Sequence, residues 1–183
     1  MAKTRTVPFA YKLLIIILAL AGIVFIYNIV PRYASVETVL NGDTLLLENG
    51  SLIKLMGVYT PECNDPEERV RRGGTAAADF TQSLVEGKKI RIEYHHRHNN
   101  TDGKALASVY LMDGTYLNAE IIRQGFGHAD SACTSGDTKA FQEYERQARD
   151  LKRGLWAVMP EIQKDGNKVL GQLCEDEKGQ EPF

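Results

Sequence analysis

The chain has 183 residues, of which 43% are hydrophobic and 25% are charged. This length is typical of about one domain, and the composition excludes wholesale disorder, collagen-like repeats and a long coiled coil. Residues 1–32 hold four of the 22 basic residues and none of the 24 acidic ones, so 18 basic and 24 acidic residues, a net charge of −6, remain for the rest. Such an acidic domain argues against binding nucleic acid mainly through clustered positive charge.

The first predicted element is a transmembrane anchor at residues 13–30. This run carries no charge, and as a helix it would span about 27 Å, close to the thickness of a bilayer's hydrocarbon core. Three basic residues precede the run and only Arg32 closely follows it. The positive-inside rule therefore places residues 1–12 in the cytoplasm and the following domain outside the membrane. The alternative is a cleavable signal peptide, with Ala19-Leu20-Ala21 as the cleavage site and a secreted domain as the product.

Residues 33–156 are predicted to form a domain that begins with a three-stranded meander. Short β-prone runs alternate with turn residues, and Asn49-Gly50 is a strong signal for a two-residue hairpin. The three runs are residues 35–40, 44–48 and 52–58. A helix is predicted next, at residues 75–85, because apolar residues recur on one face and Gly87 follows as a stop. The stretch before it, with Arg71-Arg72, is interpreted either as a contact for phosphate or, equally well, as a mixed-charge loop.

A second hairpin and two helices complete the predicted domain. Residues 89–98 alternate between apolar and polar side chains, and residues 105–111 return after a turn. Helices are predicted at residues 117–124 and 138–152. Five short strands, with one helix after the third and two at the end, suit a small closed barrel. The predicted fold class is α+β and mainly β, a five-stranded OB-fold barrel with three helices, preceded by the transmembrane helix. Residues 157–183 are predicted to be a polar tail.

Four separated motifs resemble the staphylococcal nuclease (thermonuclease) family, in that family's order over about residues 35–156. The motifs are Asn41-Gly42-Asp43-Thr44, the stretch from Lys54 to Glu62, the stretch from Thr101 to Ala107, and Ile122-Arg123-Gln124-Gly125. The ending Gly154-Leu155-Trp156 is similar to that family's as well. The resemblance implies an OB-fold enzyme that hydrolyses the phosphodiester bonds of DNA or RNA with calcium.

The resemblance also implies roles for five residues. Asp43 and the carbonyl of Thr60 would bind calcium, Glu62 would act as the general base, and Lys54 and Lys104 would hold the phosphate. Because Thr60 and Glu62 are two residues apart, an extended strand would project both side chains to one face. The simpler alternatives are that Asp43 only forms a turn and that Glu62 is an ordinary surface residue.

Three departures from the family pattern fall at these positions. Tyr59 stands where the family has an acidic metal ligand. Lys54 and Lys104 stand where it has arginines, and lysine lacks the planar fork that binds two phosphate oxygens. Since losing one such donor costs about 10²–10³ in rate, weak activity is expected. The alternative is a catalytically degenerate OB-fold module that binds a protein, an oligonucleotide or another ligand at the cell surface.

The three cysteines are too few and too scattered for a zinc or disulfide scaffold, but an exported domain meets an oxidising compartment in which a pair of them can form a bridge. Cys63 directly follows Glu62, and the resemblance implies that the connection carrying Cys133 folds over the same pocket. A Cys63–Cys133 bridge is therefore preferred, with Cys174 left unpaired in the predicted tail. Three free thiols are the alternative.

Overall fold

The computed structural model describes residues 11–20, 32–99, 103–130 and 137–158. The chain divides into two compact units, Met1–Arg32 and Tyr33–Phe183. In the first unit, residues 11–20 are helical and their side chains are exposed. Among the described residues, no helix is both long enough and apolar enough to cross a membrane. The span predicted at residues 13–30 continues beyond the described residues, so the anchor stays a prediction.

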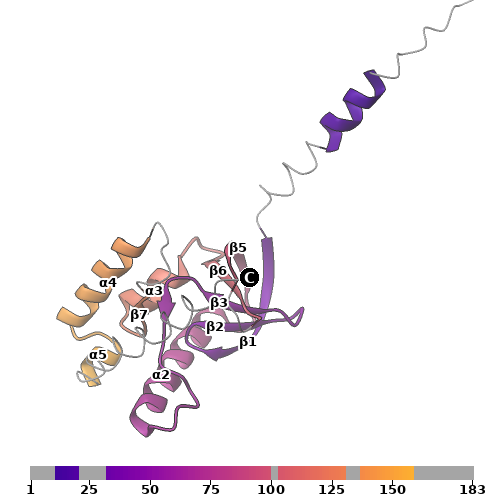
Figure 1. Ribbon diagram of the computed structural model, residues 1–183. Coiled ribbons are helices and arrows are strands. Elements are labelled where there is room, and N and C mark those ends of the chain that lie inside the picture. Colours follow the sequence, from indigo (N-terminus) through magenta and orange to yellow (C-terminus); the bar gives the residue numbers. More distant parts are fainter. Residues whose placement is uncertain (1–10, 21–31, 100–102, 131–136, 159–183) are drawn as a thin grey trace, which may run out of the picture. The chain divides into compact units, whose positions relative to one another are not determined.

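The second unit is built on a closed barrel of five strands in the order β1-β2-β3-β6-β5 (Figure 1). The strands are β1 (Arg32–Asn41), β2 (Thr44–Leu47), β3 (Leu52–Leu55), β5 (Lys89–Asn99) and β6 (Ala105–Leu111). The β1–β2, β2–β3 and β5–β6 pairs are antiparallel, whereas β3 and β6 run parallel. Alternate side chains such as Leu45, Ile53 and Val109 point inward and are completely buried. The predicted five-stranded barrel and both predicted hairpins are confirmed.

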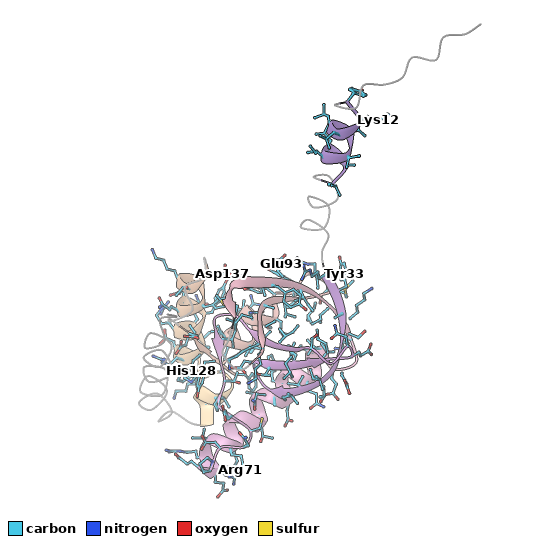
Figure 2. The ribbon with its side chains drawn as sticks, turned by 45° about the vertical axis from the view of Figure 1, so that its right-hand side comes forward. Lys12, Tyr33, Arg71, Glu93, His128 and Asp137 are labelled. Carbon is cyan, nitrogen blue, oxygen red and sulfur yellow. The ribbon has the colours of Figure 1, made fainter. Side chains whose placement is uncertain are left out.

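Four helices accompany the barrel in the described part of the chain, one more than predicted. They are α2 (Glu68–Val85), α3 (Leu117–Arg123), α4 (Thr138–Asp150) and the short α5 (Leu155–Val158). The interpretation of Arg71-Arg72 as part of a loop is wrong, because α2 begins well before residue 75. Its first turns carry charged residues and two glycines, so they show no apolar periodicity. In Figure 2, Arg71 lies at the opposite end of the domain from Tyr33.

A short two-stranded sheet, which the sequence did not predict, joins the barrel to α4. Strands β4 (Val58–Tyr59) and β7 (His128–Ala129) pair antiparallel, with Tyr59 opposite His128. The buried His128 lies on the α4 side of the domain (Figure 2), with Nδ1 3.3 Å from Oε1 of Glu145. Burial opposes the charge of Glu145, but hydrogen bonds from His128 and the Ala129 N–H hold its pKa below the ordinary value. Helix α4 is thus fastened to β7, which pairs with β4, the strand that leads into Thr60.

Asn118 in α3 connects three segments inside the domain. It is completely buried, and its Oδ1 accepts a hydrogen bond of 2.9 Å from the N–H of Val109. Its Nδ2 donates to the carbonyls of Met56 (2.9 Å) and Ala107 (3.2 Å). Both ends of this one amide therefore hold β6 and the connection between β3 and β4 in place, and that connection runs directly to the candidate site.

Candidate active site

Asp43, in the turn between β1 and β2, is the centre of the site. It is 2% exposed, which is rare for a carboxylate without partners. Its Oδ1 accepts a hydrogen bond of 2.9 Å from the Thr44 hydroxyl, and its Oδ2 accepts one of 3.2 Å from the backbone N–H of Thr60. The ammonium of Lys54 lies 3.2 Å from the same Oδ2. Asp43 therefore joins three segments as well as forming a turn.

The barrel places Lys54 in β3, beside Asp43, and Lys104 just before the start of the neighbouring strand β6. Thr44 lies opposite Lys54 in the β2–β3 ladder, and Lys54 lies opposite Leu106 in the β3–β6 ladder. Lys104 directly precedes the first residue of β6, Ala105, which lies opposite Ile53 in the β3–β6 ladder. The Lys54 side chain is 28% exposed, so its ammonium reaches solvent as well as Asp43.

Thr60 and Glu62 do not share a face, and that prediction is wrong. Strand β4 ends at Tyr59 because it pairs with only two residues of β7. Beyond it, Thr60 is 2% exposed whereas Glu62 is an exposed residue. The Thr60 hydroxyl is buried, and no hydrogen-bond partner for it lies among the described residues. The structure thus brings Thr60 to Asp43 directly and leaves the carboxylate of Glu62 facing solvent.

Helix α2 sets the distance between the Asp43 turn and the Glu62 segment. A Cβ added to Gly74 would lie 2.4 Å from the carbonyl carbon and oxygen of Glu62, so only glycine fits at this contact. A Cβ on Gly42 would lie 2.8 Å from the Cβ of Ala77, and the Thr81 hydroxyl donates a hydrogen bond of 2.7 Å to the Gly42 carbonyl. One rigid helix therefore contacts both segments of the site.

Burial, together with the carboxylates of Asp43 and Glu62, raises the pKa values of both Tyr59 and Cys63. Burial, followed by the carboxylates of Glu62 and Asp43, raises the pKa of Tyr59. Its phenol is therefore protonated at neutral pH and supplies no negative metal ligand. Burial and then the carboxylates of Asp79 and Asp43 raise the pKa of Cys63. A neutral thiol is a poor nucleophile, which argues against Cys63 as a nucleophile.

Several residues that shape the site were not singled out from the sequence. Thr44 lies in a recognised motif, and its position next to Asp43 was the available signal. The amide oxygen of Asn41 accepts a hydrogen bond of 3.2 Å from the N–H of Cys63. No local pattern could have pointed to Thr81 or Gly74, because each contacts the site across a large sequence separation. The preferred Cys63–Cys133 bridge stays a prediction, since Cys133 and Cys174 lie outside the described residues.

Comparison with known proteins shows the family to which the chain is similar. The family model described as staphylococcal nuclease homologue matches residues 52–158, more than half of the chain. A thermonuclease of Staphylococcus hyicus is 27% identical over 123 residues, which cover 65% of this chain and 72% of that protein. A thermonuclease of Staphylococcus intermedius is 29% identical over 125 residues, covering 66% and 74%. An uncharacterized endonuclease of Escherichia coli O157:H7 is 27% identical over 126 residues, covering 68% and 77%.

Proposed function

The chain belongs to the staphylococcal nuclease homologue family, and we propose that its barrel domain is a phosphodiesterase that hydrolyses DNA or RNA. The observation that carries the proposal is that Lys54 and Thr60, from two other segments, both contact the buried carboxylate of Asp43. A turn-forming aspartate would not need these partners. The alternative, a degenerate module that only binds its ligand, is an outcome of the assay below.

In the proposed reaction, Glu62 orients a water molecule and takes its proton as the oxygen attacks phosphorus. The exposed position of Glu62 leaves its carboxylate accessible to water and substrate. Lys54 in β3 and Lys104, which directly precedes β6, offset the charge that develops on the phosphate oxygens while the bond to the leaving oxygen breaks. Weak activity is expected, because two point charges replace bidentate clamps.

The oxygen atoms of this site give little support to the expected dependence on calcium. A calcium ion takes six to eight oxygen ligands. Asp43 supplies a carboxylate already paired with Lys54, Tyr59 supplies a phenol, and Thr60 supplies two neutral oxygens, its orphaned hydroxyl and the carbonyl that the resemblance implies as a ligand. Among the described residues no group of three or more His, Cys, Asp and Glu side chains could surround a metal ion. The residues present do not fit a resident calcium ion, and the proposed reaction does not require one.

The decisive experiment is a digestion assay on the full chain with single-stranded and double-stranded DNA and with RNA. Glu62→Gln keeps the shape of the side chain but removes the base, so hydrolysis is expected to fall by about 10²-fold or more. Glu48→Gln, at an exposed position outside the site, is the matched control and is expected to retain activity. Binding of an oligonucleotide without hydrolysis would instead establish the degenerate module.

We also propose that residues 13–30 anchor the protein in a membrane, with residues 1–12 in the cytoplasm and the barrel domain outside. The uncharged run and the positive charges before it support this orientation. Protease added to intact cells is expected to digest the domain while a cytoplasmic marker survives. Survival of the domain would contradict the orientation. A mature N-terminus near Gly22 would contradict the anchor and establish secretion after cleavage.

A further inference from the structure

We propose that the ammonium group of Lys54 is the resident cation of this site and occupies the place at Asp43 that the family resemblance assigns to calcium. This inference rests on the proposed phosphodiesterase function. It also changes the role of Lys54, which the sequence suggested was a weakened phosphate clamp.

Most of the acceptor positions of the Asp43 carboxylate are already occupied. An ionised carboxylate offers about four acceptor positions. The Thr44 hydroxyl occupies one on Oδ1, while the Thr60 N–H and the Lys54 ammonium, each 3.2 Å away, occupy both on Oδ2. Asp43 is 2% exposed, so it has little room to turn toward another ligand. A divalent ion can bind Oδ2 only by displacing the Lys54 ammonium or the Thr60 N–H. Without such a displacement, it has only the one remaining position on the buried Oδ1.

The charge of the groups at Asp43 also disfavours a calcium ion. Asp43 and Lys54 together are neutral, and Tyr59 adds no carboxylate beside them. A calcium ion at Asp43 would therefore approach an ammonium of the same sign, and the carboxylates of Glu62 and Asp65, which also act on Tyr59, are the acidic groups that would have to offset the repulsion. Calcium binding is disfavoured by the charge as well as by the small number of oxygen ligands.

The fold holds Lys54 next to Asp43. Its place opposite Thr44 in the β2–β3 ladder puts it beside the residue that follows Asp43. The N–H of Leu55, the next residue after Lys54, donates a hydrogen bond of 2.8 Å to the Asp43 carbonyl. The backbone that carries the ammonium is thus tied to the backbone that carries the carboxylate, so the pair does not depend on a chance side-chain conformation.

The geometry leaves Lys54 able to contact substrate. An ammonium is a compact charge with three donors. One donor faces Asp43, and the 28% exposure of the side chain leaves the others open to a phosphate oxygen. Lys54 would stabilise the negative charge on phosphorus oxygens while the water proton passes to Glu62 and the phosphorus–oxygen bond to the leaving group breaks. The site would then cleave phosphodiesters without calcium.

The test compares the full-length wild-type protein with Lys54→Met and Lys54→Arg, and uses the exposed Lys139→Met in α4 as the control. Each protein is assayed for hydrolysis in a chelator and in millimolar calcium. Calcium binding is measured separately, as the change in the thermal midpoint Tm followed by the fluorescence of Trp156. The binding measurement does not require that the protein be active.

We expect wild-type hydrolysis to be the same in chelator and in calcium, and the wild-type Tm not to respond to calcium. Lys54→Met should lose about 10²-fold in hydrolysis without metal and gain about tenfold or more in calcium affinity, because the Asp43 carboxylate is then open. Lys54→Arg keeps the positive charge and should stay insensitive to calcium, and Lys139→Met should match the wild type.

A wild-type requirement for calcium, or a calcium-dependent rise in Tm as large as that of Lys54→Met, would overturn the proposal. So would a folded Lys54→Met protein that does not respond to calcium. If Lys54→Met does not fold, the wild-type and Lys54→Arg measurements decide the question. If the wild type cleaves no nucleic acid under either condition, the proposed function fails, while the Tm comparison still decides whether Lys54 excludes calcium.

Discussion

Asn118→Ala is expected to lower the free energy of unfolding by about 3 kcal/mol, because it leaves the N–H of Val109 and the carbonyl of Met56 without their partner, removes one of two donors from the carbonyl of Ala107, and opens a cavity. All three hydrogen bonds of this side chain are 2.9–3.2 Å long and completely buried. In a domain of this size the loss corresponds to a fall in Tm of about 6–12 °C.

Chemical denaturation followed by Trp156 fluorescence measures this change, since Trp156 is the single tryptophan and is buried. Asn64→Ala, at an exposed position, is the matched control and is expected to change stability by less than about 0.5 kcal/mol. If Asn118→Ala is as stable as that control, the amide does not hold α3, β6 and the strand leading to Thr60 together.

Gly74→Ala is expected to reduce hydrolysis by about 10²-fold, because an added methyl group would displace the backbone of Glu62 and a misplacement of about 1 Å in a catalytic group has that effect. The Cβ would lie 2.4 Å from the Glu62 carbonyl, too close for either segment to keep its position. Overpacking of this kind also destabilises a fold by about 1–3 kcal/mol.

Whether Gly74→Ala raises or lowers the free energy of unfolding distinguishes the effect of this contact from the effect of helix propensity. Replacing glycine with alanine inside a helix normally stabilises it by about 1 kcal/mol, whereas the close approach to Glu62 predicts destabilisation. Thr75→Ala, at the exposed neighbouring position in α2, changes helix propensity and removes only an exposed hydroxyl hydrogen bond to the Arg71 carbonyl, so it should leave hydrolysis unchanged. A Gly74→Ala protein that is more stable than the wild type and fully active would show that α2 does not position Glu62.

The sequence by itself determined the features that depend on neighbouring residues. Period-2 alternation and the Asn49-Gly50 turn located the barrel strands and the first hairpin, because side-chain direction and turn geometry are local properties. The ordered motifs around Asp43, Lys54 and Glu62 identified the family before any contact was known. The charge pattern around residues 13–30 likewise suffices to predict the anchor, which stays a prediction.

Only the tertiary structure decided how these residues are used. Thr60 is buried and Glu62 exposed because β4 stops at Tyr59, where its pairing with β7 ends. Helix α2 extends through Gly74 because that glycine allows the helix to touch the Glu62 backbone. The ion pair between Lys54 and Asp43 arises because the β2–β3 ladder sets their side chains together. Each of these outcomes depends on a contact between segments that are separate in the chain, and such a contact leaves no periodic signal in the residues on either side of it.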